Sequence, residues 1–130
     1  MPLRALAVER LGRGATPLDV ATVGTLTQLR SLAISGNKLS DLAVVEPLIN
    51  LEALVAAGNA IVDVGPAGRL ANLRRLELDV NLITNLDALA PLERLTRFVI
   101  AGNAIDKAHC PVAPTAKSAV LATFCAGLRP

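Results

Sequence analysis

His109, Cys110 and Cys125 are the residues of this 130-residue chain whose side chains best suit covalent or metal chemistry. A catalytic cysteine needs a base that the fold places beside it, and adjacency in sequence does not supply that geometry. Two cysteines and one histidine are also an incomplete ligand set for a structural zinc ion. We therefore expect His109 at the surface or in a terminal cap. We expect the cysteines to be a pair of structural thiols at the end of the fold, rather than a disulfide or a metal site.

The rest of the sequence contains no glycine-rich phosphate loop, nucleophile motif or metal-ligating cluster. The chain is thus predicted not to be an enzyme and to use no cofactor, metal or small-molecule substrate. A net charge of +2 is too small to indicate a polyanion partner. Several arginines could contact phosphates, but aromatic residues make up only 2% of the chain, so bases would have little to stack on. Nucleic-acid binding is therefore disfavoured.

The chain is built from a repeated element, because four asparagines lie 22 residues apart along it. Each follows a run of alternating aliphatic residues, as in Leu-x-x-Leu-x-x-Leu-x-Leu-x-x-Asn-x-Leu-x-x-Leu. Fixed self-similarity at this period indicates a stack of like supersecondary units. The expected structural asparagine ladder consists of Asn37, Asn59, Asn81 and Asn103.

Each unit is predicted to be a strand, a turn and a short return segment. The alternating aliphatic residues have period two, as in a strand with one buried face. The asparagine amide can donate to and accept from the backbone of neighbouring turns. The stretches Asp41 to Pro47 and Asp87 to Pro91 suggest short helical turns on the outer side. We therefore predict an α/β fold: a right-handed solenoid with a parallel sheet on the concave face, short helical or 3-10 turns on the convex face and a C-terminal cap helix.

The chain is predicted to be one domain covering residues 1–130. Residues 1–25 form a degenerate first repeat, with Leu3, Leu6 and Val8 on the strand pattern, Leu11 in place of the asparagine and four extra residues in 12–16. Residues 26–105 hold four regular repeats. Residues 106–130 form the cap, whose helix we expect between an N-cap at Thr115 and a stop at Gly127. Its apolar face is predicted to hold Val120, Phe124 and Leu128, with Leu121 and Cys125 beside them.

The repeats resemble leucine-rich repeat proteins of the 22-residue subclass whose founder regulates protein phosphatase 1. The stretch from Ile34 to Leu48 is similar to acidic leucine-rich nuclear phosphoproteins, and the terminal helix is similar to the caps of the spliceosomal U2 A-prime protein and the axonemal dynein leucine-rich light chain. The resemblance implies an intracellular adaptor without catalysis.

The exposed strand positions form rows across the predicted sheet. Most are small or apolar, so they would make a trough with one acidic spot and an arginine-rich rim, which suits an amphipathic helix that offers carboxylates to the rim. The alternative is a structural role, in which the small residues merely let the strands curve tightly. The predicted partner-binding residues are Arg30, Ala33, Ser35, Val55, Ala57, Arg74, Arg75, Glu77, Asp79, Arg97, Val99 and Ala101.

The sequence therefore predicts a non-enzymatic module that binds a helix or loop of another protein. The alternative is a regulatory subunit that modulates a phosphatase or kinase. No basic region followed by an apolar stretch opens the chain, so no signal peptide and no membrane partner are expected. The expected location is intracellular and cytoplasmic, with nuclear and cytoskeletal or ciliary sites left open.

Overall fold

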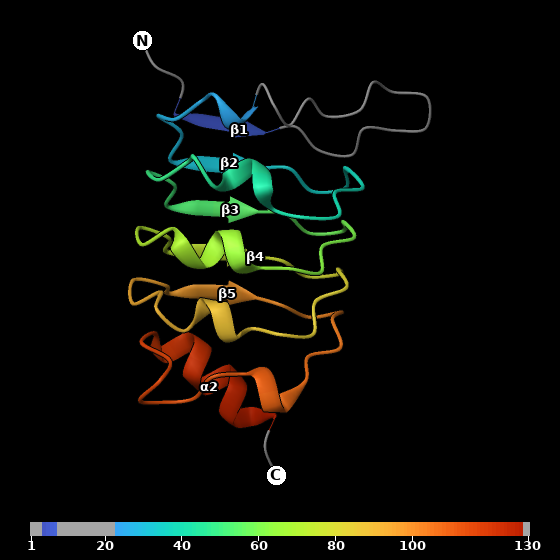
Figure 1. Cartoon of the computed structure of the whole chain (residues 1–130), viewed down its shortest axis with the longest axis vertical. Coiled ribbons are helices and arrows are strands. Elements are labelled where there is room, and N and C mark those ends of the chain that lie inside the picture. The colour runs from blue at the N-terminus through green and yellow to red at the C-terminus, as the bar shows by residue number, and fades with distance from the viewer. Residues whose placement is uncertain (1–3, 8–22, 129–130) are drawn as a thin grey trace.

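The computed structural model describes residues 4–7 and 23–128, which stack as successive coils along one axis (Figure 1). Five short strands form one parallel sheet in chain order: β1 Ala5–Ala7, β2 Ser31–Ala33, β3 Ala53–Val55, β4 Arg75–Glu77 and β5 Arg97–Val99. Between them run 3-10 turns, η1 Ala43–Val45, η2 Gly65–Arg69, η3 Asp87–Leu89 and η4 Lys107–His109, and the helix α2 Ala119–Gly127 follows. The predicted repeat solenoid, with its parallel sheet, short outer turns and C-terminal helix, is confirmed.

The strand register repeats the sequence period. Leu32 pairs with Leu54, Leu54 with Leu76 and Leu76 with Phe98, each 22 residues along the chain. Leu6 pairs with Leu32, 26 residues away, so the first coil is four residues longer than the others. Predictions for Leu3, Val8, Leu11 and residues 12–16 fall outside the described residues.

The core is an aliphatic ladder inside the coils. Because equivalent residues stack at the strand spacing of about 4.8 Å, each leucine packs on its counterparts in the neighbouring coils. Within the repeats, the leucine and isoleucine side chains that are fully removed from solvent come from the three repeats between residues 26 and 91: Leu29, Leu32, Ile34, Leu42, Leu48, Leu51, Leu54, Ile61, Leu73, Leu76, Leu78, Ile83, Leu86 and Leu89. A ladder of this kind closes its core without large aromatic residues.

Each outer turn begins at a short polar residue, of which only Asp41 was predicted from the sequence to start a turn. The side-chain oxygens of Asp41, Asp63, Asn85 and Asp106 accept hydrogen bonds of 2.8–2.9 Å from the backbone N–H two residues later. Such local bonds turn the chain out of the strand direction and start the return segment. The fourth turn, η4, forms even though the aliphatic pattern is lost at Ala108.

The C-terminal cap corrects three predictions. Cys110 and Cys125 form a disulfide rather than a pair of free thiols, because the fold brings a loop and a helix face together across 15 residues of chain. The N-cap is Ser118, not Thr115: the Ser118 hydroxyl is buried, donates to the Leu95 carbonyl at 2.7 Å and accepts from Leu121 N. Gly127 is the last residue of α2 rather than the stop beyond it.

The inward face of α2 is centred one residue away from the predicted stripe. Leu121 and Cys125 are fully buried, whereas Val120, Phe124 and Leu128 pack at the margin of the core. Phe124 meets Phe98 edge to face, with ring centroids 5.8 Å apart. The cap thus covers the last strand, where the core would otherwise be open. Among the described residues, no helix combines the length and the apolar character needed to cross a membrane.

Candidate docking face

The four ladder asparagines fix the bend after each strand. Asn81 Nδ2 donates to the carbonyls of Leu78 and Ala56 at 2.9 and 3.0 Å, and its Oδ1 accepts from Ile61 N at 3.0 Å. Asn59 and Asn103 make equivalent bonds to their own repeat and to the repeat before it. Asn37 Nδ2 bonds the Ile34 carbonyl at 2.8 Å, and its backbone N–H donates to Asn59 Oδ1. These hydrogen bonds fix the bends after the strands and thereby position the side chains on the concave face of the sheet.

The central row of the concave face lies in register across four strands. Ala33 pairs with Val55, Val55 with Glu77 and Glu77 with Val99. All four side chains are half-buried rather than fully exposed, so the row is shallow. It is apolar at Ala33, Val55 and Val99 and interrupted by Glu77.

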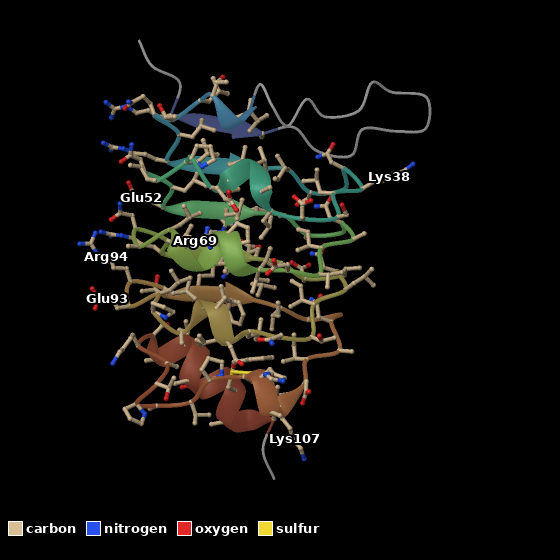
Figure 2. All side chains as sticks on the ribbon, in the orientation of Figure 1. Lys38, Glu52, Arg69, Glu93, Arg94 and Lys107 are labelled. Carbon is tan, nitrogen blue, oxygen red and sulfur yellow. A yellow bond between two sulfur atoms is a disulfide. The ribbon has the colours of Figure 1, made fainter. Side chains whose placement is uncertain are left out.

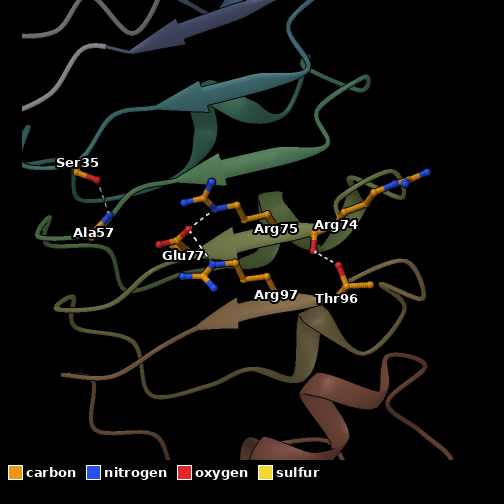
Figure 3. A network of polar contacts seen from close by, with 7 residues as sticks. All are labelled: Ser35, Ala57, Arg74, Arg75, Glu77, Thr96 and Arg97. Atoms are coloured by element: carbon orange, nitrogen blue, oxygen red, sulfur yellow. Dashed lines mark hydrogen bonds and ion pairs between the residues drawn. The ribbon is translucent and has the colours of Figure 1, made fainter.

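A second row on the concave face lies just beyond the ends of the strands and has the same spacing of one residue per repeat. Ala57 N donates to Ser35 Oγ at 3.1 Å, which occupies that hydroxyl within the sheet (Figure 3). Ser35, Ala57 and Asp79 are half-buried and Ala101 is exposed. The structure thus brings the predicted small residues together as two adjacent rows.

The predicted acidic spot at Glu77 is an ion-paired group. Arg75 Nε donates to Glu77 Oε2, and Arg97 Nε approaches the same oxygen at 3.4 Å (Figure 3). The Glu77 side chain is 14% exposed, against 49% for Arg75 and 62% for Arg97. Burial raises the pKa of Glu77, but the hydrogen bonds and charges of Arg75 and then Arg97 outweigh it and hold the pKa below its ordinary value. Two guanidinium groups around one carboxylate give this group of three side chains one net positive charge, and Asp79, the other residue of the predicted acidic spot, lies in the adjacent row.

A polar depression of about 270 Å³ lies beside the face, where the chain enters the strands. Its lining consists of Arg30, Asn50, Glu52, Asn72, Arg74 and Arg94. Arg94 Nη1 donates to Asn72 Oδ1 at 2.9 Å, and Arg30 lies 3.8 Å from Glu52. Three guanidinium groups against one carboxylate make this rim cationic, so it can receive carboxylates of a ligand.

The large apolar side chains that are most exposed lie outside the predicted face. They are Ile49, Val62, Val80 and Leu82, at 55–64% exposure. Val80 also has a φ of 57°, whereas the equivalent positions in the other repeats are Gly36, Gly58 and Gly102, all with positive φ. This group was not among the binding residues predicted from the sequence. The sign that could have pointed to it is Val80, which stands at a repeat position where three other repeats have glycine.

His109 has a structural partner rather than a catalytic one. Its Nδ1 lies 2.9 Å from Asp87 Oδ2, and both side chains are about half exposed. The hydrogen bond to Asp87 raises the pKa of His109 above its ordinary value. Cys110 is held in the disulfide, and the described residues include no set of three His, Cys, Asp or Glu side chains placed to hold a metal ion.

Solved structures similar to this chain are leucine-rich repeat proteins. An internalin of Listeria monocytogenes superposes with a TM-score of 0.70 at 25% identity, over 80% of this chain and 29% of its own. Internalin C2 of the same organism gives 0.61 at 32% identity, over 63% and 36%. A leucine-rich repeat protein of Leptospira interrogans gives 0.67 at 27% identity, over 78% and 26%. No protein-family profile and no curated protein matches the sequence.

The fold and its neighbours place the chain in the leucine-rich repeat class of solenoids. The chain spans 26–36% of the length of these three structures. The phosphatase-1-regulator-like subclass remains a prediction from the sequence.

Proposed function

We propose that the chain is a non-enzymatic protein-binding module whose concave face holds an amphipathic helix or loop of a partner protein. The observation that carries this proposal is the combination of an apolar row with a cationic rim. Ala33, Val55 and Val99 offer a shallow apolar surface in register. Arg75 and Arg97 border it, and each keeps guanidinium N–H groups that Glu77 does not use.

The partner segment suited to this face is apolar on one side and acidic along one flank. Its apolar side would cover the central row and its carboxylates would meet the arginines, whose planar fork holds a carboxylate with two hydrogen bonds. Because the chain has no Trp or Tyr, the face lacks the residues that most often dominate binding energy. We therefore expect modest affinity.

The test is a pair of labelled helical peptides that share a leucine face and differ only in carrying glutamate or lysine along one flank. Fluorescence anisotropy should show tighter binding of the glutamate peptide, by about tenfold. The variant Arg75→Glu, Glu77→Arg, Arg97→Glu keeps an internal ion pair and reverses the net charge, so it should prefer the lysine peptide. Equal binding of both peptides, or none, would count against the face.

A second variant tests the apolar row. Val55→Asp with Val99→Asp should abolish binding of the glutamate peptide, because two carboxylates would enter the apolar surface. Ala88→Asp is the matched control, since Ala88 is exposed on the convex side in η3 and should bind the peptide like the parent chain. Since Val55 and Val99 are half-buried, circular dichroism must show that the double variant remains folded.

The regulatory alternative uses the same surface. The resemblance to phosphatase-1-regulator-like proteins supports a chain that docks a phosphatase or kinase and changes its activity. A phosphatase assay on complexes purified from the native source separates the two roles: altered turnover supports regulation, whereas unaltered turnover supports a passive scaffold.

The disulfide bears on the proposed location. Cys110 and Cys125 are buried and bonded to each other, and such bonds persist mainly in oxidising compartments. This favours an oxidising compartment over the cytoplasm that the sequence predicted. Alkylation of free thiols followed by mass spectrometry of the native protein decides the matter: unlabelled cysteines support the oxidising compartment, and labelled cysteines support the cytoplasm.

A further inference from the structure

One edge of the solenoid, where the chain leaves the strands, combines exposed aliphatic side chains with carboxylates. We define this strand-end edge as residues 56–66, 78–88 and 100–106. It carries Val62, Val80 and Leu82, which are 55%, 60% and 60% exposed. It also carries four aspartates, Asp63, Asp79, Asp87 and Asp106, while Lys38 and Lys107 lie at its two ends. An exposed apolar group with mainly negative charge around it has the composition of a contact surface.

Val80 gives an independent reason to assign a role to this edge. Its φ of 57° lies in the left-handed region, which a β-branched residue occupies at a cost of about 1–3 kcal/mol. Three other repeats place glycine at this position and avoid the cost. The Val80 side chain is mostly exposed, so core packing does not repay it. Backbone strain that the fold itself does not need is concentrated at functional positions.

The opposite edge, where the chain enters the strands, has the complementary character. We define this strand-start edge as residues 46–53, 68–75 and 90–97, which contain five arginines and three glutamates. Ile49, the fourth large apolar residue that is well exposed in the described part of the chain, lies here at 64% exposure. It adjoins Asn50, which lines the depression with Arg74 and Arg94. Lys38 occupies the repeat position of Leu82 on the strand-end side. Figure 2 shows Arg94 and Lys38 on opposite sides of the stack, so the two edges face away from each other.

We propose that the strand-end edge of one chain docks on the strand-start edge of a second copy of this chain. Val80 and Leu82 would cover Ile49, while the aspartates meet the guanidinium groups around the depression. Both edges belong to the same solenoid, so the coils that form them are stacked with the same spacing of about 4.8 Å. A partner with this repeat spacing, the opposite charge and an exposed apolar residue is present in the molecule itself.

The geometry determines the kind of assembly. Because the two edges differ, the contact is heterologous. A dimer keeps one free strand-end edge on one chain and one free strand-start edge on the other, so association continues beyond a dimer. One edge is a small surface, and contacts that bury less than about 1,200 Å² are weak and transient. The apolar row of Ala33, Val55 and Val99 stays uncovered, although Arg75 and Arg97 belong both to the strand-start edge and to the rim of the concave face. The arginine variants below therefore change Arg74 and Arg94, which do not border that row.

Sedimentation velocity of the purified, oxidised chain tests the proposal. Between about 10 µM and 1 mM, the weight-average mass should rise above the 13.5 kDa monomer, and high salt should reverse the rise. Leu82→Lys should weaken association about tenfold, and Val80→Gly should weaken it without lowering the melting temperature. Thr123→Lys on α2 adds the same charge away from both edges and should associate like the parent chain. A parent chain that stays monomeric at 1 mM overturns the proposal, as does unchanged association of Leu82→Lys.

Mixing two defective chains tests the head-to-tail arrangement. Leu82→Lys leaves the strand-start edge intact, and Arg74→Glu with Arg94→Glu leaves the strand-end edge intact. Each variant alone should remain monomeric, whereas their mixture should form a dimer and nothing larger. A mixture that stays monomeric overturns the arrangement, because a symmetric contact would not be restored by this pairing.

Discussion

Replacing Asn81 with alanine should test how much the amide ladder contributes to stability. Among the ladder asparagines, Asn81 is the most deeply buried, at 6% exposure. Its Oδ1 is the acceptor for Ile61 N, and its Nδ2 donates to two carbonyls. Each of those carbonyls also accepts from a second asparagine: Asn59 bonds Ala56 O at 3.1 Å and Asn103 bonds Leu78 O at 3.0 Å. Asn81→Ala therefore orphans one buried N–H and removes one of two bonds from each carbonyl.

The expected loss follows from this count. An orphaned buried donor costs about 1–3 kcal/mol, and each of the two lost second bonds about 0.5–1 kcal/mol, so Asn81→Ala should lower the free energy of unfolding by about 2–5 kcal/mol. Asn103 makes the same kind of bonds but is half-buried, so water can replace part of them. We expect about 1–2 kcal/mol for Asn103→Ala.

The double variant sharpens the test. Removing Asn81 and Asn103 together leaves the Leu78 carbonyl without either amide, so the combined loss should exceed the sum of the single losses by about 1 kcal/mol. The assay is urea unfolding followed by far-ultraviolet circular dichroism, since the chain has no Trp or Tyr for fluorescence. A loss for Asn81→Ala below about 1 kcal/mol, or strict additivity in the double variant, would refute the reasoning.

Three further predictions use other parts of the structure. Val80→Gly should leave the free energy of unfolding unchanged or raise it by up to about 1 kcal/mol, whereas Gly58→Val should lower it by about 1–3 kcal/mol. The cost at Gly58 is backbone strain, because the only atom within 4 Å of an added Cβ there is Gly36 N. Equal effects of the two variants in urea unfolding would contradict this. Gly68→Ala should lower the free energy by about 2–3 kcal/mol, because its Cβ would meet the Ala88 carbonyl oxygen; a neutral result would show that η2 and η3 move apart freely. Nuclear magnetic resonance titration of His109, the single histidine, should give a pKa above 6.5 that falls in Asp87→Asn. Because the folded pKa is raised, the stabilisation by this pair is complete below the unfolded pKa and disappears as pH rises through the folded pKa; a pKa that Asp87→Asn leaves unchanged would remove the pair from the account.

Most of the fold could be predicted from the sequence because each repeat has the same pattern of residues. Leu32, Leu54 and Leu76 share a position in the period, and the same period sets their pairing in the sheet. A stack of like units needs no long-range information beyond the repeat itself. The strand register and the outer turns could therefore be predicted from the repeat, whereas the closing helix was predicted from its own apolar spacing.

The cap could not be predicted in the same way because it occurs once. Whether Cys110 meets Cys125 depends on where η4 and α2 lie relative to each other, and no periodic pattern reports that position. The same holds for Ser118, which begins α2 where its hydroxyl can reach the Leu95 carbonyl.

The sequence predicted which residues lie on the candidate face, but not which of their side chains interact with one another. Arg75 and Glu77 are two residues apart on one strand face, and Arg97 is the next repeat's equivalent of Arg75. These positions placed all three on the concave surface. The side-chain conformations that close an ion pair over Glu77 depend on the burial of that carboxylate, which spacing alone does not give.

The most direct test of the docking face is site-specific photo-crosslinking in extract from the native source. A photoreactive residue is placed either at Val55 on the concave sheet or at Ala88 on the convex side. The account expects Val55 to yield a discrete adduct whose crosslinked partner segment is apolar with an acidic flank. It expects Ala88 to yield no adduct with another protein, although a second copy of this chain can be crosslinked there. Adducts at Ala88 with none at Val55 would contradict it.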